Sequence, residues 1–508
     1  MSVESPTRTP ARTTVRVAVV GGGITGLAAA YRLRILLGPA AEIVLVEGSR
    51  RLGGALRTVE LAGLALDVGA EAFLMRRPEA AALVDELGIG AQLTHPTPAA
   101  PTVRAAGRTV ALPTRTLLGL PGAARDVAGL LSARGVAQLA AELSMPLHWV
   151  PGQDAAVGRL LRERAGDEIV DRLVDPLLGG VYAGRADALG LRATLPAVAT
   201  ALDRGSGSLL AAAATALPPA SAVPPASAVP PASALPPASA PDDVRPPVFG
   251  TLRGGLGDLV DALVRATGAD TRLGLPVRGL ARTSQGWRLE LGSAARPVQL
   301  AADAVLLAVP GPALRRLLAD PLPAAAAAAG RVEVASCAVV GLALPVAAVD
   351  ALPQASGVLV ASGEAVSVKA FTFSGRKWAH GRSDSVLLVR GSLGRYGEAP
   401  VLQRDDAELV DVVRTDLAAL TGVTAQPVDT VVARWGGGLP QYAPGHVDAV
   451  DALERAVAGQ PGLAVAGAVL HGVGVPACIG TADAAARRLV GYLQTTGRLA
   501  TPDSGTMV

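Results

Sequence analysis

Three glycines near the start of the chain have the spacing of a phosphate-binding turn. Gly21, Gly23 and Gly26 form the pattern G-x-G-x-x-G between an apolar, β-branched stretch and an Ala/Leu-rich stretch with helical periodicity. Such glycines allow a tight bend, close approach of the backbone to a pyrophosphate, and close packing of helix on strand. The N–H groups and the positive dipole end of the helix then face the phosphates. The expected contacts come from Gly21, Gly22, Gly23, Ile24, Thr25 and Gly26.

An acidic residue follows at the tip of a second predicted strand. Residues 43–46 are apolar, and Glu47 comes directly after them, 21 residues beyond Gly26. An acid about 20 residues beyond the glycine turn accepts hydrogen bonds from a ribose hydroxyl. An ordinary βαβ turn with a solvated glutamate is the simpler alternative, but it does not require this order of features. The stretch therefore predicts a dinucleotide site.

The next segment indicates which dinucleotide binds. Arg51-Leu52-Gly53-Gly54 resembles the R-x-G-G segment of flavoproteins of the amine-oxidase type. Two adjacent glycines let a second stretch of backbone approach the bridging phosphates, and Arg51 can neutralise them. In the simpler interpretation Arg51 is a solvated loop charge and the glycines only form a turn. The order of acid, arginine and glycine pair favours FAD, with contacts from Glu47, Gly48, Arg51, Gly53, Gly54 and Ala55.

Composition excludes several classes of protein. The chain has 508 residues, half of them hydrophobic, which is enough for two or three packed subdomains with a large core. A net charge of +3 is too small for a dedicated nucleic-acid binder. The histidines and cysteines lack metal-ligand spacing, so we expect no metal site. Cys337 and Cys478 are isolated, which fits a reducing compartment better than a disulfide framework.

Neither a secretory signal nor a membrane span is expected. The first 14 residues are polar and lack the charged and apolar regions of a signal peptide. The longest apolar run, residues 334–349, is interrupted by Ser336, Gly341 and Pro345 and falls short of a spanning helix. We expect a cytoplasmic protein, with peripheral contact to a membrane left open.

Four regions of different character follow one another along the chain. Residues 15–75 read as the nucleotide-binding βαβ unit with a third strand, and residues 76–200 read as helices broken by proline and glycine. The helices are expected at 79–87, 123–131 and 157–165. The hexapeptide PPASA-x repeats four times over 218–241, which predicts a disordered or polyproline II loop. Long β-branched runs over 331–440 predict a second sheet.

Several segments, in order along nearly the whole chain, resemble one family, the FAD-dependent protoporphyrinogen and coproporphyrinogen oxidases of haem synthesis. Residues 174–184, VDPLLGGVYAG, are similar to the family's E-P-L-L-x-G-I-Y-A-G. Residues 249–256 are similar to F-x-T-L-x-G-G-L, and residues 372–378 to T-F-S-S-x-K-W. Residues 434–446 resemble R-W…P-Q-Y…G-H, and residues 472–480 resemble the closing G-V-G-I-P-x-C-I.

The resemblance implies an α/β fold with three parts. These are a Rossmann-type FAD-binding domain of the amine-oxidase kind, a mixed-sheet substrate domain and an inserted helical lobe. We place them at 15–75, 245–310 and 455–495 for the discontinuous FAD-binding domain, 76–200 for the helical lobe, and 311–454 for the substrate domain.

The resemblance also implies further flavin contacts from the third strand and the end of the chain. The expected residues are Gly69, Ala70, Glu71, Ala72, Val277, Trp435, Val473, Gly474 and Val475. The family usually has proline and often serine where this chain has Ala70 and Ala72. The two alanines therefore weaken the expectation of a side-chain hydrogen bond to the flavin from this segment. Contacts from Gly69 and from the backbone are still expected.

The activity implied is the oxygen-dependent, six-electron oxidation of a porphyrinogen. Each of three rounds moves a hydride from a bridge carbon to the flavin, and O₂ then reoxidises the flavin to give hydrogen peroxide. The soluble branch of the family, from Gram-positive-type bacteria, acts on coproporphyrinogen III, which is the expected substrate. A downstream chelatase is a candidate partner. Protoporphyrinogen IX oxidase and flavin amine oxidase are alternatives on the same scaffold, and a porphyrin carrier with structural FAD is one from another class.

A porphyrinogen presents propionates on a flat apolar ring, so its pocket needs cations at the rim. Arginine suits bidentate carboxylate geometry, and lysine provides a point charge. The candidates are Arg76, Arg77, Lys377, Arg390 and Arg395, although each alone is more simply a solvated charge. No nucleophile with a neighbouring base is evident, so no catalytic residue is assigned. A structural role for His471 is simpler than proton transfer.

Overall fold

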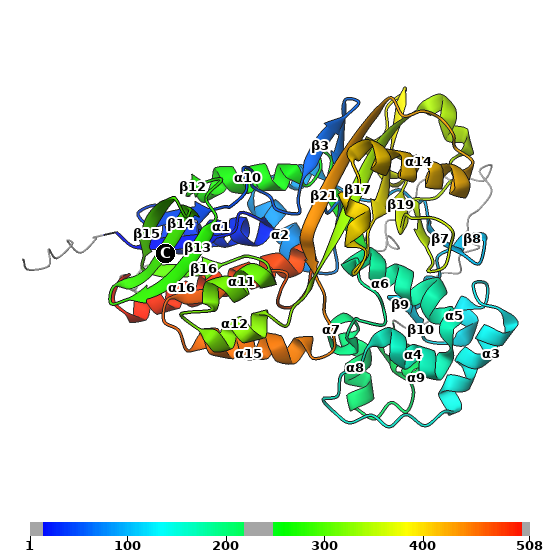
Figure 1. Cartoon of the computed structure of the whole chain (residues 1–508), viewed down its shortest axis with the longest axis horizontal. Coiled ribbons are helices and arrows are strands. Elements are labelled where there is room, and N and C mark those ends of the chain that lie inside the picture. The colour runs from blue at the N-terminus through cyan, green and yellow to red at the C-terminus, as the bar shows by residue number, and fades with distance from the viewer. Residues whose placement is uncertain (1–13, 218–246, 500–508) are drawn as a thin grey trace, which may run out of the picture. The chain divides into compact units, whose positions relative to one another are not determined.

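The computed structural model describes residues 14–217 and 247–499, and these fall into two compact units (Figure 1). The first unit contains the chain up to Gly54, Leu259–Gly330, and the chain from Val450 onward. The second unit contains Ala55–Asp258 and Arg331–Ala449. The expected repeat loop at 218–241 lies outside the described residues. Among the described residues, no helix is long and apolar enough to cross a membrane.

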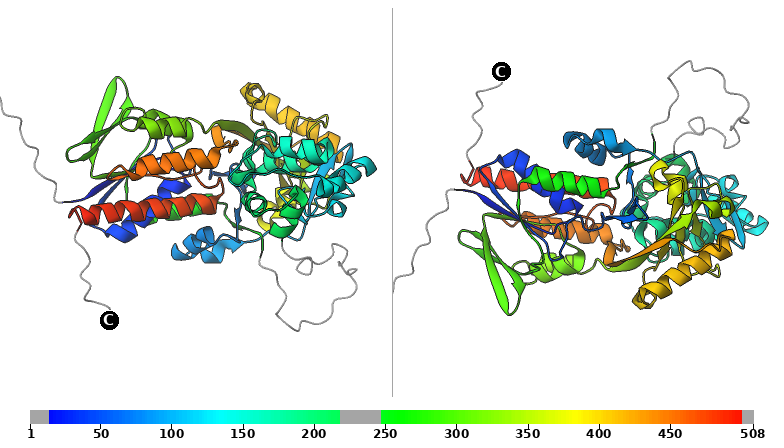
Figure 2. Two further views of the ribbon diagram at one scale, coloured as in Figure 1. Left: turned by 90° about the horizontal axis from the view of Figure 1, so that it is seen from below. Right: turned by 90° about the horizontal axis from the view of Figure 1, so that it is seen from above.

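A five-stranded parallel sheet forms the centre of the first unit. Its strand order is β12 (Asp270–Arg272), β2 (Glu42–Val46), β1 (Arg16–Val20), β16 (Ala304–Leu307) and β22 (Leu463–Val465). The central strands are continuous apolar runs, such as Ala-Val-Leu-Leu in β16, and are buried along their length, as expected of a parallel sheet covered on both faces. Helices α1 (Ile24–Leu37) and α16 (Val475–Thr495) lie side by side (Figure 2). The predicted Rossmann-type arrangement is confirmed.

Smaller elements complete the first unit. An antiparallel sheet contains β13 (Val277–Thr283), β14 (Gly286–Ser293) and β15 (Arg296–Ala302). Helices α11 (Gly311–Leu318) and α12 (Pro323–Ala329) follow. Helix α11 is tied to the small sheet because the guanidinium of Arg316 donates to the carbonyl of Val277 over 3.2 Å.

The second unit is built on a seven-stranded mixed sheet. Its order is β21 (Asp429–Pro440), β17 (Val334–Pro345), β20 (Val386–Leu393), β19 (Ala370–Thr372), β18 (Gly357–Val360), β7 (Pro101–Ala105) and β8 (Arg108–Ala111). The pair β18–β7 is parallel and the other pairs are antiparallel. A mixed sheet was expected for the substrate domain, and this part of the fold is confirmed.

Each face of this sheet has its own cover. On one face, Leu409, Val413 and Leu417 of helix α14 (Asp406–Thr421) pack on the buried side chains of β17 and β20. On the other face, Leu61 and Leu66 of the hairpin β3 (Thr58–Leu61) and β4 (Leu64–Asp67) pack on the sheet. Period-2 alternation in the strands supplies apolar side chains to both layers.

Helices dominate the chain from residue 133 to 216. They are α3 (Ala133–Ala141), α4 (Val157–Ala165), α5 (Asp167–Ile169), α6 (Asp175–Tyr182), α7 (Leu191–Thr194), α8 (Pro196–Asp203) and α9 (Leu209–Ala216), with a π-helical turn, Val170–Val174, between α5 and α6. Helix α2 (Pro78–Glu86) confirms the helix predicted at 79–87, and α4 confirms the one at 157–165. The helix predicted at 123–131 is wrong: only a short 3₁₀ turn, Ala124–Val127, forms before Gly129, since glycine is a poor helix former.

The remaining short elements connect these layers. Strands β5 (Phe73–Leu74), β11 (Phe249–Leu252) and β6 (Leu93–Thr94) form a small antiparallel sheet, and β9 (Thr116–Leu117) pairs with β10 (Leu120–Pro121). The other helices are α10 (Gly257–Thr267), α13 (Ser374–Lys377) and α15 (His446–Ala458).

The compact units correct the domain limits predicted from sequence. Residues 55–75 belong to the second unit, because the β3–β4 hairpin packs on its sheet. Residues 311–330 belong to the first unit, because α11 packs beside β13. The expected helical lobe at 76–200 is interrupted by β7 and β8, which extend the mixed sheet.

Candidate active site

The predicted glycine turn joins β1 to α1 in the first unit. Gly21 has a φ of +106°, and its N–H donates to the carbonyl of Val46 over 2.8 Å. A Cβ at Gly21 would lie 2.3 Å from the carbonyl oxygen of Ala308, and one at Gly26 would lie 1.8 Å from that of Gly21. Backbone occupies the space at both positions, so only glycine fits.

A second glycine turn lies against the first. The N–H of Gly53 donates to the carbonyl of Gly22 over 2.8 Å, and Gly53 forms a parallel bridge with Gly23. A Cβ at Gly23 would have only one atom within 4 Å, the Cα of Gly54 at 3.8 Å. Two stretches of backbone therefore meet without side chains between them, beside the start of α1.

The acid at the end of β2 accepts hydrogen bonds from backbone. The Glu47 carboxylate accepts the N–H of Gly22 over 2.6 Å and the N–H of Ser49 over 2.7 Å. Arg51 donates to the carbonyl of Gly54 over 2.8 Å, so this arginine shapes the second glycine turn. The predicted group of Glu47, Arg51 and the two glycine turns is thus assembled within one unit, as the segment order indicated.

The start of α16 supplies a third glycine-lined segment of the same unit. Val473 follows Gly472, whose φ is +144°, and the helix begins at Val475 after an N-cap, Gly474, that provides no side-chain hydrogen bond. Upstream, a Cβ at Gly467 would lie 3.5 Å from the hydroxyl of Thr25 in the first turn of α1.

These features fit a bound dinucleotide. The first turns of α1 and α16 carry no side-chain cap, so their N–H groups are available to phosphate oxygens. The space beside Gly23 would be filled by a side chain, and glycine leaves it open. Two further predicted residues lie nearby in the fold: Gly48 is beside Pro276, and Val277 is buried at the start of β13.

The segment of residues 68–72, which connects β4 to β5 in the second unit and is not itself a strand, is held by several hydrogen bonds. The indole N–H of Trp435 donates to the carbonyl of Val68 over 2.9 Å, and Arg390 donates to that of Gly69 over 2.9 Å. The N–H of Ala70 donates to the carbonyl of Ala55 over 3.0 Å. A Cβ at Gly69 would lie 1.9 Å from that same carbonyl oxygen. The tertiary fold therefore brings Ala55, Gly69, Ala70, Glu71 and Trp435 together.

Glu71 and two predicted substrate cations form one ion-pair cluster. One carboxylate oxygen accepts from the Lys377 ammonium and the other from the Arg390 guanidinium. Burial alone would raise the pKa of Glu71, but the charges and hydrogen bonds of the two cations outweigh it and lower the pKa to about 2. In this structure Lys377 and Arg390 thus neutralise Glu71 and fix the segment that carries it, rather than standing free at a rim.

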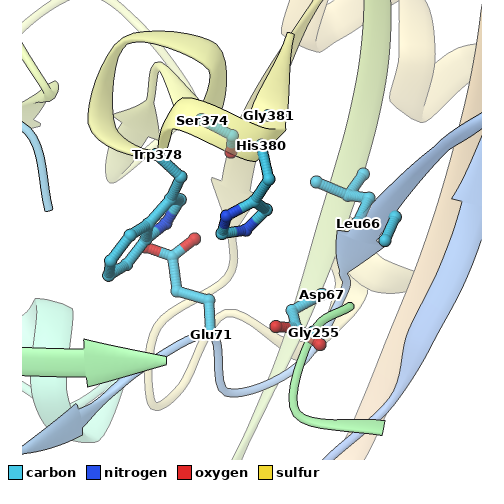
Figure 3. Close-up of a pocket in the computed structure, with 9 residues that line it drawn as sticks. Leu66, Asp67, Glu71, Gly255, Ser374, Trp378, His380 and Gly381 are labelled. Atoms are coloured by element: carbon cyan, nitrogen blue, oxygen red, sulfur yellow. The ribbon is translucent and has the colours of Figure 1, made fainter. Parts of the chain in front are cut away.

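A small polar cavity lies beside this cluster (Figure 3). It has a volume of about 20 Å³, enough for one water molecule, and Asp67, Glu71, Ser374, Trp378 and His380 contribute to its wall. The Ser374 hydroxyl is buried and has no hydrogen-bond partner among the described residues. Burial lowers the pKa of His380, against the charge of Glu71, which acts to raise it.

Asp67 links this cavity to the start of α10. Its carboxylate accepts the hydroxyl of Thr58 over 2.5 Å and the N–H of Leu256 over 3.1 Å, while the Thr58 hydroxyl also accepts the N–H of Gly257 over 2.8 Å. Burial raises the pKa of Asp67 to about 6, although these hydrogen bonds act to lower it. The role of Asp67 was not predicted, because its backbone partner Leu256 lies 189 residues away in sequence.

The other predicted substrate cations lie apart from Glu71. Arg76 is exposed, and Arg77 pairs with Glu79 over 2.6 Å. Arg395 follows β20 and donates to the carbonyl of Val360 over 3.2 Å. Elsewhere, His471 pairs at the surface with Glu454 over 2.8 Å, which agrees with a structural role.

The chain belongs to the flavin containing amine oxidoreductase family, whose model matches residues 24–490. Its cofactor is therefore a flavin, and its class is oxidoreductase. Within that class, the chain is 44% identical over 471 residues to the coproporphyrinogen III oxidase of Mycobacterium leprae, covering 93% of this chain and 97% of the relative. It is 29% identical to the coproporphyrinogen III oxidase of Bacillus subtilis, covering 94% and 98%.

A solved structure shares the fold over the same length. It is a protein from Exiguobacterium sp. 255-15 assigned as a protoporphyrinogen oxidase, with a TM-score of 0.76 and 27% identity, covering 94% of this chain and 98% of that one.

Proposed function

We propose that this protein is an FAD-dependent coproporphyrinogen III oxidase that forms coproporphyrin III. The observation that carries the proposal is the full-length similarity to coproporphyrinogen III oxidases, which reaches 44% identity. The overall reaction removes six electrons and six protons from the substrate, and three O₂ molecules become three hydrogen peroxide molecules. The proposal includes a cytoplasmic location, which the two free, buried cysteines suit.

Different segments of the chain would hold different parts of the cofactor. The backbone of Gly21–Gly26 and the pair Gly53–Gly54 would hold the pyrophosphate, with the start of α16 as a further source of N–H groups. Glu47 would exchange one of its backbone hydrogen bonds for the ribose hydroxyls. Bound FAD supplies the two-electron acceptor for each round and is reoxidised by O₂.

The cluster around Glu71 would position the segment of residues 69–72 beside the flavin. Arg390 holds both the carbonyl of Gly69 and the carboxylate of Glu71, and Trp435 holds the carbonyl of Val68. These contacts fix backbone and charge before substrate arrives, and such preorganisation lowers the free energy spent on orientation. No described residue needs to act as a nucleophile in this chemistry.

The experiment that tests the proposal is anaerobic mixing of the purified flavoprotein with coproporphyrinogen III or protoporphyrinogen IX. Loss of flavin absorbance with coproporphyrinogen III, followed by O₂ uptake and porphyrin formation in air, is the expected result. If only protoporphyrinogen IX reduces the flavin, the protein is instead a protoporphyrinogen IX oxidase. This is the second candidate, which the Exiguobacterium structure favours. Reduction by amines alone would indicate an amine oxidase, and no reduction by any of them would indicate a carrier.

A further inference from the structure

Lys369 is a buried cation without an anionic partner. It precedes β19, where its backbone is fixed by hydrogen bonds to Ser392 on one side and Val360 on the other. The residue is only 6% exposed, and the ammonium donates a single hydrogen bond, to the carbonyl of Gly394 over 2.9 Å. An ammonium has three donors, and a buried charge is normally paired. No carboxylate of the described residues lies within 4.0 Å of it.

A second cation, Arg395, follows Gly394 directly. Its guanidinium donates to the carbonyl of Val360 over 3.2 Å, its Nε is buried without a partner, and no described carboxylate pairs with it. Glu398 accepts the backbone N–H of Arg395 and pairs instead with the guanidinium of Arg185 over 2.6 Å. Two neighbouring cations therefore share one region of the fold, and their own side-chain partners are neutral carbonyl groups.

The two charges act on each other. Burial lowers the pKa of Lys369, and the charge of Arg395 lowers it further, against opposite effects from Cys337 and Glu398. Gly179 of helix α6 has no side chain to cover the guanidinium: a Cβ at Gly179 would lie 3.7 Å from the Arg395 Nε. The arrangement keeps two like charges close together with unused donors.

Lys377 and Arg390 show what a completed cluster of this kind looks like in the same unit. Both converge on the carboxylate of Glu71, and each of its oxygens is used. The pair Lys369 and Arg395 repeats the two cations without the carboxylate. What is missing is one small anion with two oxygens.

We infer that Lys369 and Arg395 form a subsite for one carboxylate group of the substrate. The inference rests on the proposed function, in which that group is a propionate of the porphyrinogen. A carboxylate would accept from the free donors of both cations and neutralise the excess charge, with charge-assisted hydrogen bonds to each. Lys369 is thereby a residue that sets affinity for carboxylate-bearing substrates, and it acts on binding rather than on electron transfer.

The test compares the flavin-loaded full chain with its Lys369→Met and Arg395→Met variants. The matched control is Arg414→Met on α14, which removes a cation paired with Asp411 over 3.1 Å. Two readouts are steady-state kinetics with coproporphyrinogen III, and the affinities for coproporphyrin III and its tetramethyl ester. The ester keeps the ring and lacks the carboxylate charges.

Both site variants are expected to raise KM about tenfold with kcat changed less than about twofold, as loss of a charged hydrogen bond predicts. The preference for the acid over the ester should fall by about the same factor, while Arg414→Met behaves like the unaltered chain. Unchanged KM and unchanged acid preference would overturn the inference, and so would equal losses for acid and ester, which indicate packing alone. If the Lys369→Met protein does not fold, the KM and the acid preference of Arg395→Met decide whether the inference holds.

The two proposals fail separately. An unaltered chain that does not oxidise coproporphyrinogen III defeats the proposed function. A chain that oxidises it, with site variants that keep its KM and acid preference, defeats only the carboxylate subsite.

Discussion

The two units of the chain present their polar groups in different ways. In the first unit, the groups predicted to meet the dinucleotide are backbone N–H groups at glycine turns, and even Glu47 is satisfied by two of them. In the second unit, the segment of residues 69–72 is also predicted to meet the flavin. It is held by charged side chains, with Glu71 between Lys377 and Arg390. A backbone site is set by local conformation, whereas a side-chain site depends on charges that balance only in the folded chain.

This difference predicts opposite kinds of sensitivity. The first unit should be damaged by added volume in its first glycine turn, because Gly21 and Gly26 have no room for a Cβ. The second unit should be damaged by changed charge, because the largely buried carboxylate of Glu71 is matched by two cations. The following changes test that contrast, beginning with the largest expected effect.

Gly26→Val should have the largest effect. A Cβ at this position would lie 1.8 Å from the carbonyl oxygen of Gly21, so the turn must open or the helix must shift. We expect a loss of stability on the order of 4 kcal/mol or more, together with loss of bound flavin. Thermal unfolding and the flavin-to-protein absorbance ratio measure both.

Gly491→Ala is the matched control for added volume, since a Cβ there meets nothing within 4 Å on the same unit's α16. It should keep the flavin and gain up to about 1 kcal/mol. A Gly26→Val protein that kept full flavin content would break the comparison between the two units.

Glu71→Gln should have the next largest effect, through charge rather than volume. The change leaves Lys377 and Arg390 without their shared anion, and for this largely buried ion pair the loss of one partner should cost up to about 3–5 kcal/mol. Denaturant unfolding should show this loss at pH 7. Glu79→Gln removes a peripheral pair with Arg77 and should cost less than about 1 kcal/mol.

Acid should reduce the difference between the unaltered chain and Glu71→Gln. Because the pKa of Glu71 is lowered from 4.5 to about 2, its ionised form stabilises the fold above pH 4.5. That contribution, about 3 kcal/mol, is lost as the pH falls from 4.5 towards 2. A stability difference that stayed constant over this range would contradict the ion-pair assignment.

Asp67→Asn should show the opposite pH dependence. The pKa of Asp67 is raised from 3.8 to about 6, so the folded chain favours the protonated acid. Its contribution is present below pH 3.8 and is lost as the pH rises through 6. The variant should therefore gain about 3 kcal/mol relative to the unaltered chain between pH 3.5 and pH 7, measured by paired unfolding curves. Equal slopes would show that Asp67 titrates normally.

Ser374→Ala should have the smallest effect. The hydroxyl has no described protein partner and faces a space for one water molecule, so its removal should change stability by less than about 1 kcal/mol. Unfolding curves of the variant and of Thr215→Ala, an exposed helical hydroxyl, should nearly coincide. A loss above about 2 kcal/mol would show a direct hydrogen bond that the structure does not contain.

Local patterns predicted much of the fold and half of the candidate site. Apolar runs and glycine spacing predicted β1, the turn at Gly21–Gly26, α1, β2 and the acid Glu47, because each depends on neighbours in sequence. Local patterns failed where packing decides. The hairpin Thr58–Asp67 joined the second unit because its apolar face covers the mixed sheet. Strand β7 was missed because its partner β18 lies about 250 residues away, and β8 joins the sheet only through β7.

Sequence also could not show which cations are available to bind a substrate. Lys377 and Arg390 were predicted as free substrate contacts, yet each pairs with Glu71 across more than 300 residues. Lys369 gave no signal except that it is one of two lysines, and its burial without an anion became visible only in the folded chain.

By itself, the sequence determined the family, the dinucleotide turn and the order of the elements, because backbone conformation and apolar periodicity are local properties. Only the tertiary structure decided which charges are neutralised and which remain available. Electrostatic free energy depends on distance and burial, and both arise when segments remote in sequence meet.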